Sequence, residues 1–274
     1  MDIGGPTAKA LFIPNGSNFL FMHLFRLTKP FVFTIFGASG DLAKVKLFPA
    51  LYALMEQKRF LNDFLILGFG RSNMTSDQFR KQVAKSIRDN GVALPDQELL
   101  KKLLAHVQYC VGQYNDEKSF SSLANTISAF SHGKRISVVH YLAVPPEIFT
   151  PVIKNLANLK SRLGADTKLV IEKPFGYDEQ SARDLYHLIS MHFQREQIFL
   201  LDHYLRKEAV QSILAIRYAN GILNTLLSGP LISNIQITAF EDLSVANRIH
   251  YFDQVGIIKD MIQSHLLQVL ALLT

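Results

Sequence analysis

The fold is decided by the stretch Phe31-Val32-Phe33-Thr34-Ile35-Phe36-Gly37-Ala38-Ser39-Gly40-Asp41-Leu42-Ala43. Its first six residues are an apolar run rich in β-branched and aromatic side chains, which is typical of a buried strand. After Gly37, apolar residues at helical spacing predict a helix over 42–58. A glycine-containing turn between a strand and a helix lets the backbone approach a pyrophosphate, and the helix N-terminus offers free amide groups to it. The stretch therefore indicates a nucleotide-binding turn.

The same alternation of short apolar runs and helical periodicity continues to about residue 201. Strands are predicted at 64–69, 136–144, 169–171 and 198–201, and helices at 76–89, 96–106, 147–160 and 179–194. The second and third helices are expected to begin with a Ser or Asp cap, at Ser76 and Asp96. Strands that alternate with helices of this length indicate βαβ units. The predicted fold class is α/β, a Rossmann-type doubly wound parallel sheet.

The pattern changes after Asp202. A helix over 206–219 leads to an alternating strand at 234–240 and then to a helix over 256–274. This order is typical of the start of an α+β domain. The expected organisation is an N-terminal extension at 1–30, an NADP-binding Rossmann domain at 31–203 and the incomplete beginning of an α+β substrate and dimerisation domain at 204–274.

Composition excludes several classes of protein. The 274 residues are 48% hydrophobic and 19% charged, which is too apolar for intrinsic disorder. The formal charge of +6 is spread along the chain, so we expect an anionic small-molecule ligand and no nucleic acid. The single cysteine, Cys110, excludes an internal disulfide framework and fits a reducing compartment. The apolar runs are too short to cross a bilayer and no histidine pair has metal-ligand spacing, so we expect neither a membrane nor a metal.

Residues 1–30 contain one acidic residue, Asp2, and three basic ones. Scarce acidic residues are a property of transit peptides, but the segment has few serines and little amphipathic order. We therefore expect an N-terminal extension of a cytoplasmic protein, with a targeting signal as the alternative.

The end of the second predicted strand bears on the choice of coenzyme. A NAD site usually has an acidic residue there for the ribose hydroxyls, whereas a NADP site has a basic residue for the 2′-phosphate. Here the strand is followed by Arg71, and the next acidic residue is Asp77. Arg71 can form a bidentate pair with a phosphate, so NADP is favoured. The alternative is a surface arginine in a loop.

Three clusters of polar residues follow at or after the carboxyl ends of later strands, where ligands bind in open α/β sheets. They are Glu172-Lys173-Pro174-Phe175-Gly176, Asp202-His203-Tyr204-Leu205-Arg206-Lys207-Glu208 and Lys259-Asp260-Met261-Ile262-Gln263-Ser264-His265. Lys173 can bind a reacting hydroxyl or a phosphate, or pair with Glu172. His265 lies in an apolar helix, where a lone histidine is either a hydrogen-bonded core residue or a general base held by a carboxylate.

Taken together, these motifs resemble the glucose-6-phosphate dehydrogenase family. The matching segments are Gly37–Ala43, Tyr141–Pro146, Glu172–Gly176, Asp202–Glu208 and the stretch from Tyr251 to Gln268. They occur in the family's order, and the resemblance runs from about Phe31 to the last residue. It covers the family's coenzyme domain and only the start of its second domain, so a member shortened at its C-terminus is expected.

The resemblance implies oxidation of glucose 6-phosphate by NADP to 6-phosphoglucono-lactone, the first oxidative step of the pentose phosphate pathway. It implies that His265 is the general base, that Asp202 is its partner and that Lys173 contacts both the reacting sugar and the coenzyme. The implied sugar-binding residues are His203, Tyr204 and Lys207 for the phosphate, and Glu241 and Asp260 for the hydroxyls. The implied coenzyme-binding residues are Gly37, Ala38, Ser39, Gly40, Asp41, Leu42, Lys46, Arg71 and Lys173.

The chain departs from the family pattern at two motifs. Arg206 replaces a glycine of the family, and Asn247, Ile249 and His250 replace three more, so the second loop cannot freely follow the same backbone path. The family is usually oligomeric, but its interface is expected beyond residue 274. These departures leave open a non-catalytic NADP-binding protein of this family. A further alternative, another NADP-dependent sugar or sugar-acid oxidoreductase, needs only the Rossmann signals, and the Asp202–Glu208 cluster argues against it.

Overall fold

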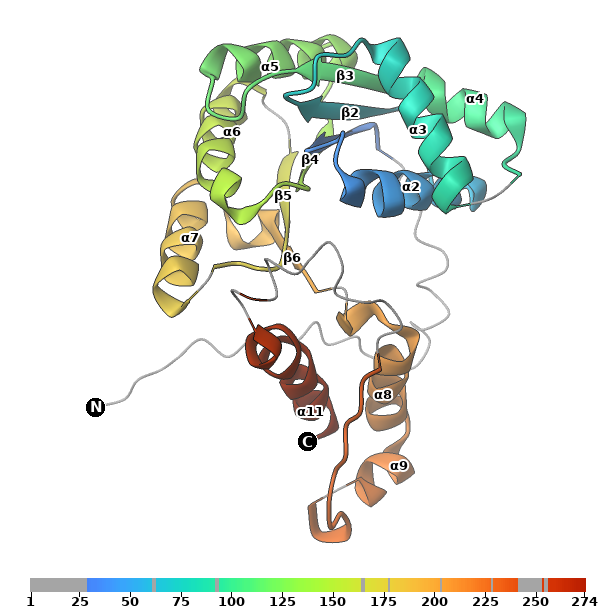
Figure 1. Ribbon diagram of the computed structural model, residues 1–274, viewed down its shortest axis with the longest axis vertical. Coiled ribbons are helices and arrows are strands. Elements are labelled where there is room, and N and C mark those ends of the chain that lie inside the picture. Colours follow the sequence, from blue (N-terminus) through green and yellow to red (C-terminus); the bar gives the residue numbers. More distant parts are fainter. Residues whose placement is uncertain are drawn as a thin grey trace. The chain divides into compact units, whose positions relative to one another are not determined.

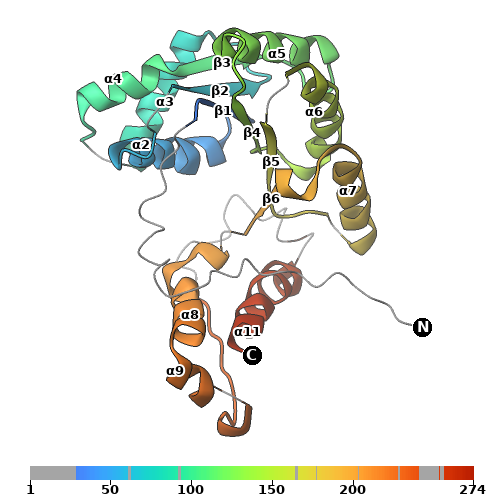
Figure 2. The same ribbon diagram turned by 180° about the vertical axis from the view of Figure 1, so that it is seen from behind.

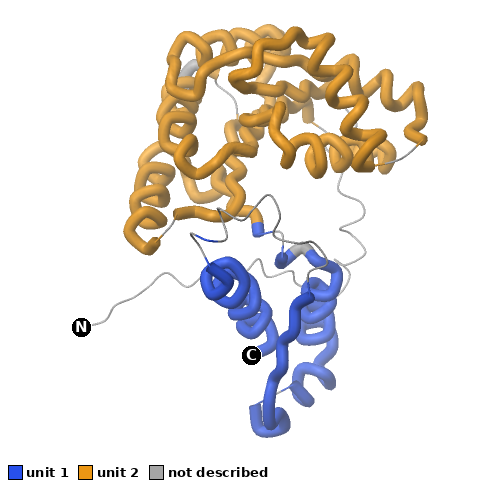
Figure 3. Tube along the Cα trace, in the orientation of Figure 1, with its two compact units in different colours: residues 1–25, 202–274 blue, residues 26–201 orange. Residues whose placement is uncertain are grey.

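The computed structural model describes residues 29–60, 63–91, 94–163, 166–176, 178–202, 204–227, 229–240, 253 and 256–274. The chain divides into two compact units, residues 26–201 and residues 1–25 with 202–274 (Figure 3). The predicted N-terminal extension, at 1–30, lies almost wholly outside the described residues.

The 26–201 unit is built on a six-stranded sheet of order β3-β2-β1-β4-β5-β6 (Figure 1). Its strands are β1 Phe31–Phe36, β2 Phe64–Gly70, β3 Val107–Val111, β4 Ser137–Leu142, β5 Asp166–Glu172 and β6 Ile198–Leu201. Every neighbouring pair is parallel. The strand order reverses between β1 and β4, and ligands of open α/β sheets bind at such a switch point. The predicted doubly wound parallel sheet is confirmed.

Helices cover both faces of this sheet (Figures 1 and 2). On one face α2 (Phe48–Glu56), α3 (Ser76–Asn90) and α4 (Gln97–Ala105) pack against side chains of β1, β2 and β3. On the other face α5 (Glu117–Ser131), α6 (Phe149–Leu163) and α7 (Glu179–His192) pack against alternate side chains of β1, β2, β4 and β5. Because β1, β2 and β4 are buried on both faces, their sequences are mainly apolar, with Thr34 on β1 and His140 on β4 as buried polar residues.

Polar residues fix where the helices begin. Asp96 caps α4 as predicted, because its carboxylate accepts a hydrogen bond of 2.9 Å from the Leu99 amide. The prediction for α3 is wrong by one residue. Thr75 caps that helix in a reciprocal capping box with Gln78. The Ser76 hydroxyl instead accepts a hydrogen bond from the Tyr109 amide, which fastens α3 to β3.

The sequence analysis did not predict β3 and α5. β3 is an edge strand with the polar residue Gln108, and its side chains are only partly buried, so it lacks the apolar run of the other strands. α5 is rich in serine, which is a weaker helix former than alanine or leucine. Its buried residues Phe120, Leu123, Ala124 and Ile127 nevertheless have helical spacing, which is a signal that could have been used.

The 202–274 unit is mainly helical in its described part. It contains the short 3₁₀ turn η5 (Tyr204–Arg206), α8 (Glu208–Ala219), α9 (Gly221–Leu226), the turn η6 (Gly229–Leu231), the π-helical segment η8 (Ile258–Leu266) and α11 (Leu267–Leu273). Its small core is formed by Tyr204, Val210 and Val269. The Arg217 guanidinium links α8 to the end of α11, because it donates to the backbone oxygens of Leu273 and Thr274.

The predicted strand at 234–240 is wrong. These residues have no assigned helix or strand, and they pair with no strand in the described part of the chain. The alternation itself is real, since Ile237 and Ala239 pack against the small core while Phe240 is exposed. A strand needs a hydrogen-bonded neighbour as well as an alternating pattern, and only the second can be read from the sequence.

His140 on β4 lies in the core of the 26–201 unit, and burial lowers its pKa to about 3. Between pH 6.5 and about 3 the unfolded chain therefore binds a proton that the folded chain does not. Stability consequently falls as pH falls through this window. From pH 7 to pH 5 we expect the free energy of unfolding to drop by about 2 kcal/mol more in the wild type than in His140→Phe.

Denaturant unfolding at the two pH values measures this difference. His187→Phe is the matched control, because His187 is exposed on α7 and should not change the dependence on pH. Equal losses of stability in His140→Phe and the wild type would contradict the assignment of a neutral buried His140.

Candidate active site and coenzyme site

The turn after β1 has a backbone shape that excludes most side chains. Gly37 has a φ of +80°, in the left-handed region. A Cβ placed there would lie 2.2 Å from the backbone oxygen of Ala143 at the end of β4. The Gly37 amide donates to Phe69 O at 3.0 Å, and the Gly40 amide donates to Gly37 O at 2.9 Å. Three neighbouring strands thus hold this turn in place.

The helix that follows the turn places several predicted coenzyme residues. Ala38 is buried, whereas Asp41 and Lys46 are exposed and Leu42 is half-buried. The predicted helix over 42–58 is present but is not uniform, because the π-helical segment η2 (Ala43–Leu47) precedes α2. Gln82 on α3 donates a long hydrogen bond of 3.5 Å to Ala38 O and so supports the turn from the side.

Arg71 lies at the carboxyl end of β2, and its guanidinium carbon is 5.7 Å from the centre of the Tyr114 ring. This distance is typical of a cation–π contact. Burial raises the pKa of the Tyr114 phenol, while Arg71 and a hydrogen bond with the Gly37 backbone oppose that rise. Tyr114 therefore connects the arginine to the glycine turn. The sequence analysis missed Tyr114, because it predicted no strand at 107–111 and therefore did not place Gly112-Gln113-Tyr114 at the sheet edge.

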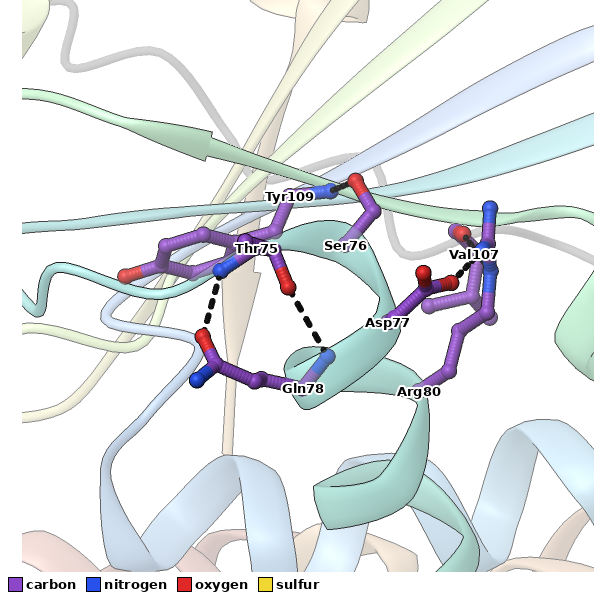
Figure 4. A network of polar contacts seen from close by, with 7 residues as sticks. All are labelled: Thr75, Ser76, Asp77, Gln78, Arg80, Val107 and Tyr109. Carbon is purple, nitrogen blue, oxygen red and sulfur yellow. Dashed lines mark hydrogen bonds and ion pairs between the residues drawn. The ribbon is translucent and has the colours of Figure 1, made fainter.

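Asp77, the first acidic residue after β2, is paired with an arginine of α3 (Figure 4). It forms an ion pair of 2.5 Å with Arg80, whose Nε donates to the backbone oxygen of Val107 at 3.0 Å. The carboxylate that could have bound ribose hydroxyls thus faces an arginine on its own helix. Arg71 remains the charged residue at the end of β2, which favours a coenzyme that carries a 2′-phosphate.

Lys173 follows β5 in a turn that contains a cis peptide bond before Pro174. Next to it, the carboxylate of Glu172 accepts a hydrogen bond from the Tyr141 hydroxyl of β4. Burial and this carboxylate raise the pKa of Tyr141 above its ordinary value, so the phenol stays protonated and remains a donor. Tyr141 is a second residue that the sequence analysis missed, since it predicted only Lys173 as a partner for Glu172.

The structure brings Asp202 and His265 together, as the resemblance implied. His265 Nδ1 lies 3.8 Å from Asp202 Oδ1, and the two side chains are only 7% and 10% exposed. This separation is an ion-pair distance, longer than a hydrogen bond. Catalytic contacts are often this loose without substrate and tighten when it binds. The arrangement can hold an imidazole with one nitrogen toward a carboxylate and the other available as a base.

Neighbouring groups hold this pair in its orientation. The Tyr204 amide donates to Asp202 Oδ1 at 3.0 Å, and the Tyr204 ring stacks on His265 with centroids 4.4 Å apart. In the amide orientation that satisfies both of its ends, Gln268 donates to Asp202 Oδ2 and to Ser264 O. The two carboxylate oxygens of Asp202 therefore accept hydrogen bonds from different donors, Tyr204 and Gln268.

The structure describes only some of the remaining predicted substrate residues. The Lys207 ammonium lies 4.2 Å from the centre of the Tyr204 ring, and Asp260 is half-buried on η8, the segment that carries His265. His203 and Glu241 lie outside the described residues, as do positions 247, 249 and 250, where glycines of the family are replaced. The Arg206 side chain is likewise not described.

The described part of the chain has neither a metal-binding cluster nor a membrane-spanning helix. Its His, Cys, Asp and Glu side chains form no group of three that could hold a metal ion. None of its helices combines the length and the apolar character needed to span a membrane.

The residues of the glycine turn fit a dinucleotide. Gly37 leaves no room for a side chain, the turn leads directly into a helix N-terminus, and an exposed arginine lies at the end of the next strand. A pyrophosphate and a 2′-phosphate are anions that such amides and such an arginine bind.

Comparison with known proteins agrees with this geometry. The family model described as "Glucose-6-phosphate dehydrogenase, NAD binding domain" matches residues 34–212, and the model described as the C-terminal domain of the same enzyme matches 214–274. A solved structure of "Glucose-6-phosphate dehydrogenase in complex with its substrate glucose-6-phosphate" superposes with a TM-score of 0.83 at 35% identity. It covers 91% of this chain, and the match spans 52% of the solved chain.

Curated relatives give the same result. A cytoplasmic glucose-6-phosphate 1-dehydrogenase of Arabidopsis thaliana is 41% identical over 248 residues, and a chloroplastic one from the same plant is 37% identical over 242. Each match covers 87% of this chain but only 48% and 42% of the respective relative. The chain thus spans about half the length of the curated relatives that it matches.

Proposed function

Because the chain belongs to the glucose-6-phosphate dehydrogenase family, we propose that it oxidises D-glucose 6-phosphate at C1 to 6-phospho-D-glucono-1,5-lactone with NADP. The members of this family are oxidoreductases, and NADP is the family's coenzyme. The observation that carries the proposal is the buried pair of Asp202 and His265, in a chain whose other unit has the glycine turn.

His265 is the general base of the proposed reaction. Asp202 lies on the Nδ1 side of the imidazole, so Nε2 is the nitrogen that accepts the proton of the C1 hydroxyl. The resulting imidazolium is stabilised by the Asp202 carboxylate. Bound NADP supplies the acceptor for the hydride that leaves C1. Tyr204 keeps the imidazole ring in place by stacking on it.

The coenzyme is held by residues of the 26–201 unit. Gly37, Ala38, Ser39, Gly40, Asp41 and Leu42 surround the pyrophosphate with the backbone of the turn, and Lys46 and Arg71 add positive charge. Arg71 binds the 2′-phosphate. Lys173 contacts both the coenzyme and the sugar. The support for these roles is the shape of the turn, the exposure of Arg71 and the engagement of Asp77 by Arg80.

Glucose 6-phosphate is held by residues that lie between Asp202 and His265 in the sequence. Lys207, Tyr204 and His203 bind the phosphate, because a cation, a phenol and an imidazole together suit a dianion. Asp260 and Glu241 accept hydrogen bonds from sugar hydroxyls. Among the described members of this set, Tyr204 contacts both His265 and Lys207, which supports a single site in the 202–274 unit.

We also propose the wider setting of the protein. Its Rossmann domain comprises 31–203, and 204–274 begins a substrate and dimerisation domain. It acts in the cytoplasm at the first oxidative step of the pentose phosphate pathway, as a homo-oligomer like its family. The cytoplasmic Arabidopsis relative supports this location, although a chloroplastic relative is nearly as similar. A second candidate, coenzyme binding without turnover, is favoured by Arg206, Ile249 and His250 at positions where the family usually has glycine.

Replacing Arg71 by alanine tests the choice of coenzyme. A guanidinium bound to a phosphate contributes about 1.5 to 3 kcal/mol, so we expect the Kd of NADP to rise about 30-fold. The Kd of NAD, which lacks the phosphate, should change by less than about threefold. Titration calorimetry measures both constants on the whole chain.

Arg183→Ala is the control, because it removes the same charge from an exposed ion pair on α7. It should leave both dissociation constants unchanged. If Arg71→Ala weakened NADP and NAD equally, Arg71 would not bind the 2′-phosphate.

A further inference from the structure

Tyr109 on β3 lies against two glycines of the neighbouring strand β2. The strand register places Tyr109 opposite Gly68. A Cβ added at Gly68 would lie 2.9 Å from Tyr109 Cδ2, and a Cβ added at Gly70 would lie 2.9 Å from Tyr109 Oη. Residues two apart on a strand share a face, so the two glycines leave a continuous space over β2. The rings of Phe79 and Tyr109 fill this space, and Tyr109 carries its hydroxyl to the carboxyl end of the strand.

Other hydroxyl groups meet the Tyr109 hydroxyl at that end. A Cβ at Gly70 would also lie 3.6 Å from Tyr114 Oη and 3.9 Å from Ser39 Oγ. Ser39 Oγ is in turn 3.0 Å from Ser72 Oγ, within hydrogen-bond distance. Hydroxyls from the glycine turn, the end of β2, β3 and the segment after β3 thus gather around the backbone that carries Arg71.

The Tyr109 hydroxyl can still donate a hydrogen bond. It is buried, and within the described residues it makes no hydrogen bond of regular geometry. Burial raises the pKa of this phenol, whereas contacts with the side chain and backbone of Ser72 partly oppose the rise. Ser72 is therefore close enough to act on it, although the contact does not meet the geometry of a regular bond. A buried donor left in this state costs free energy until it finds an acceptor.

The rest of Tyr109 is fixed firmly. Its amide donates to the Ser76 hydroxyl at 3.0 Å, and its ring packs on Phe79 with centroids 4.8 Å apart. Figure 4 shows the ring extending away from the start of α3, with the hydroxyl at its far end. A rigid ring with a buried hydroxyl can orient a neighbouring serine at little entropic cost.

We propose that Tyr109 is a specificity-determining residue of the coenzyme site, and that its hydroxyl donates a hydrogen bond to Ser72 Oγ. With this bond made, Ser72 can donate its proton to Ser39 Oγ, and Ser39 can donate its own proton to a phosphate oxygen. Both serines thereby assist Arg71 in binding a phosphate. NAD has a hydroxyl at that position and gains less from these donors. This inference rests on the proposed use of NADP and of Arg71.

Tyr109→Phe tests the proposal, because it removes the hydroxyl and keeps the ring between the two glycines. We expect the Kd of NADP to rise about fivefold and the Kd of NAD to change by less than twofold, since the loss is one neutral hydrogen bond. Ser72→Ala should give the same pattern. The double variant should bind NADP no more weakly than the weaker single variant, because both changes break one chain of hydrogen bonds.

Titration calorimetry on the whole chain, with NADP and NAD as ligands, separates the outcomes. If Tyr109→Phe changes both constants equally or changes neither, or if the two substitutions add fully, Tyr109 serves packing alone and the inference is wrong. Arg71→Ala is measured alongside. A normal Kd for NADP in Arg71→Ala would overturn the proposed coenzyme site itself, whereas a weakened one with an unaffected Tyr109→Phe would overturn only the role of Tyr109.

Discussion

Replacing His265 by asparagine is expected to lower kcat for glucose 6-phosphate oxidation about 10³-fold, which is the usual range for loss of a general base. Asparagine is polar and fits the same space, but it cannot accept the proton of the C1 hydroxyl. The Kd of NADP should change by less than about twofold, because the coenzyme residues lie in the other unit. Steady-state kinetics, with calorimetry for coenzyme binding, measure both quantities.

His187→Asn is the matched control for this experiment. It makes the same chemical change at an exposed histidine of α7, so kcat should stay at the wild-type value. A kcat for His265→Asn within tenfold of the wild type would mean that His265 is a core histidine that packs beneath Tyr204. In that case the proton would have to go to another group.

Replacing Gly37 by alanine is expected to raise the Kd of NADP more than about 100-fold and to lower the free energy of unfolding by about 3 kcal/mol or more. The φ of +80° is unfavourable for alanine, and the new Cβ would lie 2.2 Å from a backbone oxygen of Ala143. No side-chain rotation relieves a contact with backbone. The turn must therefore shift, and its amides shift with it.

Gly133→Ala separates the cost of the positive φ from the cost of the contact with the backbone oxygen. Gly133 has a similar φ of +76°, but a Cβ there would meet nothing within 4 Å. This variant should lose only about 1 kcal/mol, the cost of the backbone conformation, and should bind NADP normally. If Gly37→Ala behaved like Gly133→Ala, the close approach of the turn to β4 would not control coenzyme binding.

The central part of the fold could be predicted because its signals are local. Each of β1, β2 and β4 is a mainly apolar run buried on both faces, and Gly37 marks the end of the first. The edge strand β3 could not be read in this way, since only Val107 of its five residues is buried and both Gln108 and Val111 are exposed. The segment 234–240 shows the opposite error, because an alternating pattern does not supply the neighbouring strand that a ladder requires.

The charged residues of the site could be predicted, but the tyrosines around them could not. Arg71, Lys173 and Asp202 follow apolar strands, where a polar residue stands out in the sequence. Tyr109 and Tyr141 lie within strands, where tyrosine is a common residue and suggests only packing. The contacts of Tyr109 with Gly68 and of Tyr141 with Glu172 depend on the register between strands that helices separate in the sequence, and register is visible only in the structure.

The most direct test of this account is the formation of NADPH, followed by its ultraviolet absorbance, when the purified chain is given glucose 6-phosphate and NADP. The account predicts steady NADPH formation, which is lost in His265→Asn and depends on the sugar phosphate. NADP binding without NADPH formation would contradict it and would identify the chain as a coenzyme-binding protein without dehydrogenase activity.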